Sequence, residues 1–396
     1  MPFKPRFTCL LPIYPEYVGG KQYFVDSKDQ NTMYSHLFHN VREVCRDSIS
    51  RIDRRYINNV TTSPNLLELR QAVLGYFMAT AIRRIQENNR QDYLSSCIVH
   101  VEIAKDKHQW EGLLIITLTE EWENAIRANK GILPPVMDDM IDYLYDDYVN
   151  SNTKGRNNGE LLPTTLIPPK ADVMVEIASL FLKKDYRIEV INSDQDVPAL
   201  LDKDGQLKLT HAVNIFVGGQ ILDRGITIAN LLCFFYGRNP RKLQQDTVLQ
   251  HSRMYGNRSK KDMAVTRFYT TFRLYTLVAE INELDEQLRQ WLIKYSTTAN
   301  FDPSMAVVFS NHSDLRPCAG GKIAMSDCVA LRAGKRMVHA GFQTDCQTRI
   351  KQIINDIGVA ITSMPNYKNM DLDGIFEVDV NTVIDLLKKV RSTYIY

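Results

Sequence analysis

The stretch GGQILDRGITIANLLCFFYGRNPRKLQQDTVLQHSRMYGNR, residues 218–258, carries most of the information about the fold. An apolar run at 213–217 leads into it, and a second apolar run at 231–236 lies in its middle. Both runs are short, rich in aliphatic or aromatic residues and bounded by glycine or polar segments, which is typical of buried strands. The stretch therefore predicts two strands of a buried sheet, each followed by a polar segment.

Strand-like and helix-like segments alternate from about residue 95 to residue 271. We expect further strands at 96–103, 186–192 and 263–269, and helices at 107–127 and 172–183. Such alternation is typical of an α/β fold with a doubly wound parallel sheet. The acidic segment 138–147 and the polar segment NSNTKGRNNG at 150–159, which we interpret as a loop, predict an insertion or lid near 130–170.

Helical patterns flank this region on both sides. Ser63 followed by Pro64 predicts a helix start near the N-terminal side. Apolar residues spaced three and four apart predict one amphipathic helix from Leu277 to Leu292 and another over 380–390. We therefore expect a mostly helical N-terminal region at 1–94, a parallel-sheet domain at 95–275 and a helical C-terminal extension at 276–396.

The composition is that of an ordinary globular protein. Of 396 residues, 44% are hydrophobic and 24% are charged, and the net charge of +2 gives no indication of nucleic-acid binding by itself. Seven cysteines without a Cys-x-x-Cys pair fit a reducing compartment. The sequence has no long apolar run, so we expect a cytoplasmic protein that does not enter a membrane.

The polar segment after the first strand has the residues that phosphate recognition needs. Two adjacent glycines allow a sharp turn whose N–H groups can face an anion. Asp223 can accept from a ribose hydroxyl, Gly225 allows close approach of a nucleic-acid backbone, and Thr227 can donate to a phosphate. A structural turn with a salt bridge is the alternative interpretation. The residues expected to couple ATP or nucleic acid are Gly218, Gly219, Asp223, Arg224, Gly225 and Thr227.

The second polar segment brings Gln250, Arg253 and Arg258 close together in the sequence. Arginine is always charged and its fork of donors matches phosphate oxygens. An arginine at a γ-phosphate contributes several orders of magnitude to the rate of phosphoryl transfer. We therefore expect these three residues to be catalytic, with the two arginines at the phosphates of ATP. A solvated face is the alternative, and Met254 and Tyr255 between the arginines fit a plain core as well.

The runs GGQILDRGITI and DTVLQHSRMYGNR resemble the signature of the Z-one domain family. Weaker similarity extends over residues 5–300, including SPNLLELRQAVLGYFMATAIRR at 63–84. The resemblance implies a RecA-like fold related to the second motor domain of superfamily-two helicases. It also implies a role in bacterial defence against phage or foreign DNA. The family also carries the label endonuclease.

The parts that would hold ATP in such a motor are not evident. The sequence has no Gly-x-x-x-x-Gly-Lys-Ser/Thr loop and no Asp-Glu pair in the order that would hold magnesium. We therefore expect the C-terminal motor-domain portion of an ATP-dependent DNA helicase or translocase, inactive alone, whose ATP and Mg²⁺ bind only with an N-terminal motor half. DNA is the expected partner, RNA is not excluded, and proteins of a defence complex are further candidates.

Two other functions remain open. A metal-dependent endonuclease would need clustered carboxylates and a lysine, and Glu189, Asp194, Asp202 and Lys208 are the candidates by residue type. A non-enzymatic scaffold would instead bind a partner through the 277–292 helix and the C-terminal region, and a hydrophobic stripe left exposed would favour it.

Overall fold

The fold was analysed in a computed structural model of the chain. It describes residues 10–87, 89–102, 104–191, 201–203, 205–219, 228–240, 243–252, 254–295, 315–316, 343–344, 346–369 and 376–395. Contacts between Cα atoms divide the chain into two compact units, Met1–Ile323 and Ala324–Tyr396. None of the described helices is both long enough and apolar enough to span a bilayer.

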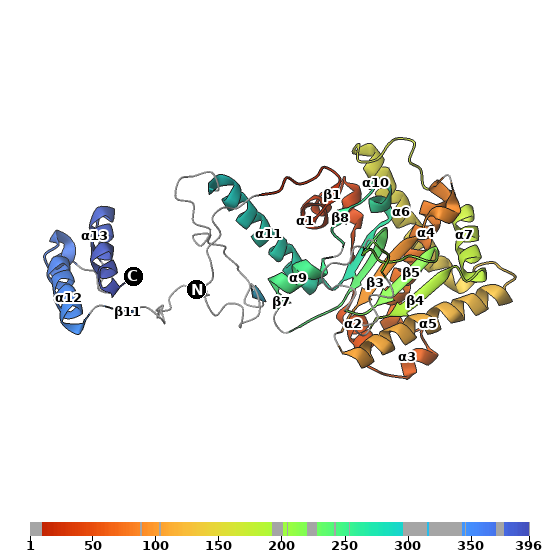
Figure 1. The fold of residues 1–396 in the computed structure, drawn as a ribbon, viewed down its shortest axis with the longest axis horizontal. Helices are drawn as coiled ribbons and strands as arrows, with labels where there is room; N and C mark the ends of the chain where they lie inside the picture. Colours follow the sequence, from red (N-terminus) through yellow and green to blue (C-terminus); the bar gives the residue numbers. More distant parts are fainter. Residues whose placement is uncertain are drawn as a thin grey trace. The chain divides into compact units, whose positions relative to one another are not determined.

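The first unit is a mixed α/β structure built on a six-stranded sheet in which every neighbouring pair is parallel (Figure 1). The strand order is β2-β9-β6-β3-β5-β4, so β3 lies between β6 and β5. The strands are β2 (Phe38–Asn40), β3 (Ser95–His100), β4 (Tyr186–Val190), β5 (Val213–Val217), β6 (Leu231–Tyr236) and β9 (Arg267–Thr270). Every residue of β3, β5, β6 and β9 is buried, because helices cover both faces of the sheet.

Helices pack on both faces of this sheet, and we name the faces after α4 and α11. The helices whose side chains join the core of the α4 face are α2 (Glu43–Ser50), α4 (Leu67–Gln86), α5 (Lys105–Ala128), α6 (Asp138–Asn157) and α7 (Lys170–Leu182). Those that join the core of the α11 face are α1 (Gly20–Phe24), α9 (Gln245–His251) and α11 (Phe272–Tyr295). The short helix α10 (Lys260–Val265) contributes residues to both cores.

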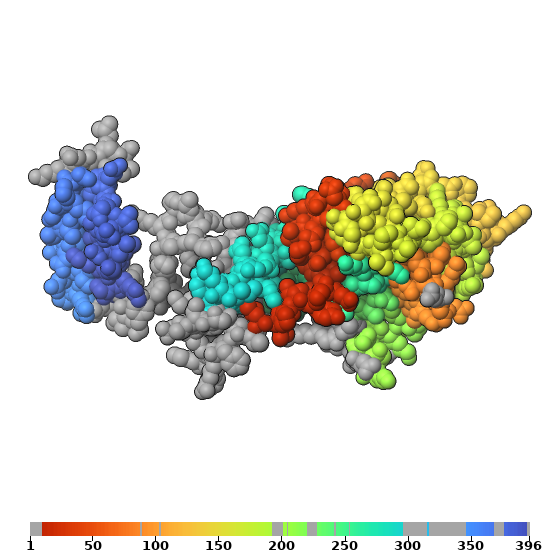
Figure 2. All heavy atoms as spheres, turned by 90° about the horizontal axis from the view of Figure 1, so that it is seen from above, coloured from red at the N-terminus to blue at the C-terminus, as the bar shows by residue number. Residues whose placement is uncertain are grey.

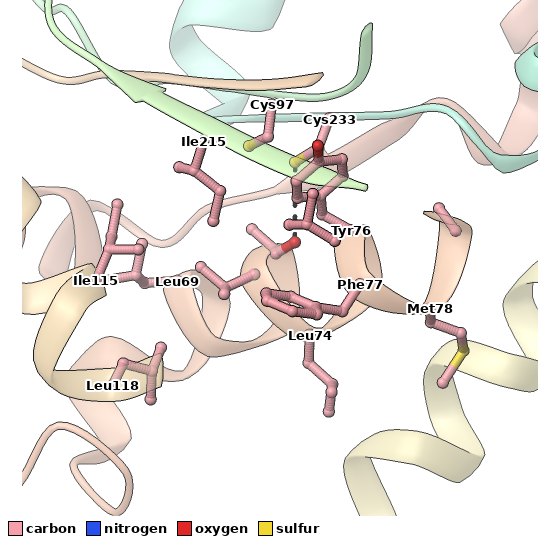
Figure 3. Close-up of a cluster of buried hydrophobic side chains, with 14 of the residues drawn as sticks. Leu69, Leu74, Tyr76, Phe77, Met78, Cys97, Ile115, Leu118, Ile215 and Cys233 are labelled. Carbon is pink, nitrogen blue, oxygen red and sulfur yellow. Dashed lines mark hydrogen bonds between the residues drawn. The ribbon is translucent and has the colours of Figure 1, made fainter. Parts of the chain in front are cut away.

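The core of the α4 face is organised by α4 itself. This helix is apolar on almost all sides and nearly all of it is buried, as expected for a helix covered by the sheet on one side and by α6 and α7 on the other. Figure 3 shows part of this core, in which Phe77 of α4 lies below Cys97 and Cys233 of the sheet. Phe77 stacks on Phe181 of α7 with ring centroids 4.3 Å apart.

Alternate residues of the same strands build the core of the α11 face. Ile98, Phe216 and Phe234 belong to this second core, whereas their neighbours along the strands belong to the first. This division follows from the two-residue period of a strand, which sends successive side chains to opposite faces. The stripe of α11 predicted from its spacing is buried here at Leu277 and Ile281, so this helix is a structural layer of the first unit.

Most of the predicted elements are confirmed. The strands at 213–217 and 231–236 have the predicted bounds, and those near 96 and 186 end a few residues early. The helices near 107, 172, 277 and 380 are present, and that expected at Ser63 begins as a 3₁₀ turn, Pro64–Leu66, before α4. Strand and helix therefore alternate as the sequence predicted.

Two predictions were wrong. The segment 263–269, predicted to be a strand, begins as the end of α10 and becomes strand only at Arg267. The segment 150–159, predicted to be a loop, is helical through Asn157 as the end of α6. The buried Ser151 hydroxyl is satisfied in place, because it donates to the carbonyl of Ala264 at 2.9 Å and lies 3.3 Å from that of Met33.

The N-terminal region contributes directly to the sheet. Strand β2 pairs with β9 and forms one edge, with Phe38 in register with Phe268. Helix α4 packs on β6 and β9. The region expected to be mostly helical is therefore part of the same α/β core.

A buried charged cluster connects β2, α6 and β9. Arg267, only 1% exposed, donates from Nε to Asp147 Oδ2 at 2.7 Å. His36 Nδ1 donates to Asp147 Oδ1 at 2.6 Å, and His39 Nε2 lies 3.4 Å from Oδ2. Burial by itself raises the pKa of Asp147, but the Arg267 charge and the two histidine hydrogen bonds outweigh it and hold the pKa well below its ordinary value.

We predict that Asp147→Asn lowers the free energy of unfolding by about 3–5 kcal/mol, because it leaves the Arg267 charge buried without its partner. The folded pKa of Asp147 is below its unfolded value, so this stabilisation is present above about pH 4 and is lost as the pH falls further. Urea unfolding at neutral and acid pH measures both effects. Asp146→Asn, at the exposed neighbouring position, is the control. An equal, small loss in both variants would contradict a stabilising role for the cluster.

Candidate functional site

The order of the strands creates a crevice at the carboxyl ends of β3 and β6. The chain leaves β3 toward β4 on one side of the sheet and leaves β6 toward β9 on the other. Neighbouring strands with diverging connections leave an opening between their carboxyl ends, and open α/β sheets bind their ligands at such points. The last residues of the two strands, His100 and Tyr236, lie at this opening with ring centroids 5.9 Å apart.

His100 is the central side chain of the crevice. It is 1% exposed, and neither of its ring nitrogens has a hydrogen-bond partner among the described residues. Burial, followed by the neighbouring His251, Arg238 and His108, lowers the pKa of His100 well below its ordinary value. The ring is therefore neutral at pH 7 and offers one donor and one acceptor. A buried polar group left unpaired costs free energy, and this cost is recovered if a ligand supplies the partner.

Two further histidines surround His100 from different elements. His108, in the first turn of α5, lies 6.0 Å from it between ring centroids and donates from Nε2 to the Glu102 carbonyl at 2.7 Å. His251, the last residue of α9, lies 5.6 Å from His100 with its ring edge-on. The crevice is thus bounded by the segments that follow β3 and β6.

Arg238 adds a permanent charge just after β6. Its Nη1 lies 3.2 Å from His251 Nδ1. The same Nη1 lies 3.5 Å from Nε2 of the His251 ring. Nε of Arg238 is buried and has no partner in the described part of the chain. The crevice therefore combines one positive charge with several donors and has the character of an anion site.

The predicted Gly-Gly turn lies at the same edge of the sheet. Gly218 follows β5 with φ +128°, a conformation that favours glycine, and its N–H donates to the Val99 carbonyl at 3.0 Å. A Cβ at Gly218 would lie 2.5 Å from the Ile191 carbonyl oxygen, and one at Gly219 would lie 2.9 Å from Cε1 of His100. Gly219 thus lets the backbone pass close to His100, and Gly218 lets it pass close to the Ile191 carbonyl, where a larger residue would not fit.

A small pocket of about 60 Å³ opens beside Arg238, between the end of β6 and α9. Sites that enclose a whole small molecule measure about 300–1,000 Å³, so this pocket accommodates only a fragment such as one phosphate group. Gln250, predicted to be catalytic, is partly buried on α9 directly before His251. The pocket by itself is too small to enclose a nucleotide.

The predicted site residues have three different outcomes. Gly218, Gly219 and Gln250 lie on the segments that border the crevice, as described above. Arg258 lies elsewhere. The remaining predicted residues fall outside the described part of the chain: Asp223, Arg224, Gly225, Thr227 and Arg253.

Arg258 lies at the opposite end of β6. It donates from Nη1 to the carbonyl of Leu231, the first residue of β6, at 3.1 Å, and from Nε to that of Met254 at 2.9 Å. Five residue steps of about 3.3 Å separate Leu231 from Tyr236, so Arg258 is about 16 Å from the crevice along the strand. Burial lowers the pKa of Arg258, an effect that Tyr23 and Asp262 oppose. The two hydrogen bonds of Arg258 to backbone carbonyls indicate a structural role.

Sequence reasoning did not find His100, His108, Arg238 or His251. One signal was present, because His100 ends an otherwise apolar strand, where polar residues of α/β proteins meet ligands. The partners of His100 could not be identified in this way, since His251 is far away in the sequence.

The carboxylates considered for a nuclease have other roles where they are described. Glu189 forms an ion pair with Arg187 on the same strand, and Asp202 accepts the N–H of Gln206 at 2.8 Å in a turn. Asp194 lies outside the described residues. Within the described part of the chain, no group of three His, Cys, Asp or Glu side chains has the geometry to hold a metal ion.

We predict that Arg258→Ala lowers the free energy of unfolding by about 1–3 kcal/mol, because two backbone carbonyls lose their charged donor. Lys260→Ala, at an exposed position of the same segment, should change stability by no more than about 0.5 kcal/mol. Chemical denaturation of both variants measures the difference. Equal stability of the two variants would contradict a structural role for Arg258. Arg258 would then again be a candidate for phosphate binding.

Comparison with known proteins gives one match. A search of curated proteins and a search of solved structures each found none that matches the chain. A family model described as the Z1 domain, the Z-one family of the sequence resemblance, matches residues 68–315, which is more than half of the chain. The matched range contains every strand of the sheet except β2, together with the crevice and the Gly-Gly turn. The chain therefore belongs to the Z1 domain family.

Proposed function

We propose that this chain is the second motor domain of an ATP-dependent superfamily-two-type DNA helicase or translocase, and that its sheet binds phosphate groups at the crevice between β3 and β6. The observation that carries the proposal is the buried His100, without a hydrogen-bond partner in the described part of the chain, near Arg238 and the Gly-Gly turn at the carboxyl edge. A RecA-like arrangement and a role in bacterial defence are parts of the same proposal, and both rest on the sequence resemblance.

A phosphodiester or nucleotide phosphate fits the chemistry of the crevice. Its oxygens would accept from Arg238 and from the proton of neutral His100, groups that have no partner among the described residues. The positive charge of Arg238 attracts an anion without the cost of charging a buried histidine. Contacts of this kind fix the position of a nucleic-acid backbone and carry no base specificity.

The small volume of the pocket supports the idea of a half-site. A pocket of about 60 Å³ leaves no room for a nucleoside, so base and sugar would lie outside it. In the proposed motor, a separate ATP-binding half supplies the phosphate loop and Mg²⁺, and Arg253 and Gln250 reach the nucleotide from this side. On this proposal the isolated chain does not hydrolyse ATP.

The proposal is tested by the binding of single-stranded DNA across a salt series. We predict that the wild-type chain binds and that its affinity falls steeply with salt, because phosphate contacts release counterions. Arg238→Ala should weaken binding about tenfold at low salt and reduce the salt slope by about one, because one phosphate contact is lost.

Arg55→Ala is the matched control, because Arg55 is an exposed arginine on α3 (Arg55–Asn58) whose side chain pairs with Asp53. It should leave both affinity and salt slope unchanged. Equal binding by the Arg238 and Arg55 variants, or no binding by the wild-type chain at any salt concentration, would contradict the proposed site.

A further inference from the structure

The described part of the C-terminal unit has almost no core of its own. It contains α12 (Gln347–Thr362), the 3₁₀ helix η9 (Pro365–Asn369), α13 (Val380–Arg391) and the two-stranded ribbon of β11 (Gln343–Thr344) and β12 (Tyr394–Ile395). The two helices lie side by side (Figure 1, Figure 2), and neither contains a buried residue. Units below about 70–80 residues rarely gain enough stability from a single core, and association with another chain is a common remedy.

Helix α13 has one broad apolar face. Leu386, at one edge of this face, is partly buried. Five further aliphatic residues of the same face remain 40–74% exposed. They are Val380, Val383, Ile384, Leu387 and Val390. Their spacing of three, one, three and three forms a continuous stripe along the helix, which is the pattern of a helix–helix seam.

This stripe is symmetric about its centre. Val380 and Val390 lie five residues before and after Asp385, and Val383 and Leu387 lie two residues before and after it. An antiparallel pair of α13 helices with its twofold axis at this point would bring Val380 opposite Val390, Val383 opposite Leu387 and Ile384 opposite Leu386. Asp385 itself lies at least about 100° around the helix from each of these residues, so the axis does not bring two carboxylates together.

The charges at the helix ends favour the same arrangement. Asp379 caps the N-terminus by accepting the N–H of Thr382 at 3.0 Å, whereas Lys388, Lys389 and Arg391 lie in the last turn. A parallel pair would bring the basic ends of the two helices together. An antiparallel pair brings the acidic end of one copy opposite the basic end of the other and aligns the helix dipoles favourably.

We propose that the C-terminal unit is a dimerisation module in which α13 pairs with α13 of a second copy of this chain, antiparallel, through the aliphatic stripe. The exposed face of α13 thus packs against the same face of the second copy, as a twofold interface requires. The inference is independent of the proposed motor function, because it uses no residue of the first unit.

The mass of the full-length chain in solution tests the proposal, measured by analytical ultracentrifugation over a concentration series. The wild-type chain should form a dimer, and V383D/L387D should weaken it at least about tenfold by burying charge in the seam. N355A, at an exposed position of α12 outside the proposed seam, is the control and should dimerise like the wild type. A wild-type monomer throughout, or a dimer unaffected by V383D/L387D, would overturn the proposal.

Disulfide cross-linking tests the orientation. In the antiparallel pair, V380C/V390C places each new cysteine opposite one of the second copy, so mild oxidation should link the dimer well above the level of the parent chain. V380C alone, which faces its own counterpart only in a parallel pair, should remain at the parent level. Cross-linking by V380C alone would contradict the antiparallel arrangement.

Discussion

The pairing of β3 between β5 and β6 is the constraint on which the rest of the first unit depends. All the strands of the six-stranded sheet are parallel, so the chain must cross one face of the sheet between successive strands. The helices in these connections bury both faces of the sheet. With β3 in the middle, the chain leaves toward one edge after β3 and toward the other after β6. The crevice that contains His100 is a consequence of this topology.

Polarity is distributed differently at the two ends of the sheet. At the amino end, the guanidinium of Arg258 donates hydrogen bonds to two backbone carbonyls. Arg83 donates from Nε to Asp262 at 2.7 Å. At the carboxyl end, His100 and Nε of Arg238 remain without partners among the described residues. Fully paired charges stabilise a fold, whereas an unpaired buried donor costs free energy that a bound ligand would recover. This contrast is the reason for locating the proposed phosphate site at the carboxyl end.

Much of the architecture could be predicted from local pattern. The apolar runs at 213–217 and 231–236 gave strands with the observed bounds, because a strand buried on both faces is a short continuous apolar run. The loop predicted at 150–159 failed because α6 continues to Asn157, with the Ser151 hydroxyl bonded to the carbonyl of Ala264. Such contacts override local propensity and are not visible in the sequence.

The candidate site was less predictable than the fold. The Gly-Gly turn was found because glycine has a local conformational meaning. His100 was not, since a single histidine in an apolar strand is indistinguishable from a core residue until its neighbours are known. The expectation that Arg258 lies with the glycines treated closeness in sequence as closeness in space. The chain instead runs from α9 back to the amino edge before it enters β9.

Histidine NMR would test the phosphate site most directly. The chain has eight histidines, so selective isotope labelling gives a small set of ring signals, and single substitutions would assign them. On titration with short single-stranded DNA, the signals of His100, His108 and His251 should shift together, while those of His36 and His39 at the far edge strand remain in place. Shifts confined to other histidines, or none at saturating DNA, would contradict a phosphate site at the carboxyl edge of the sheet.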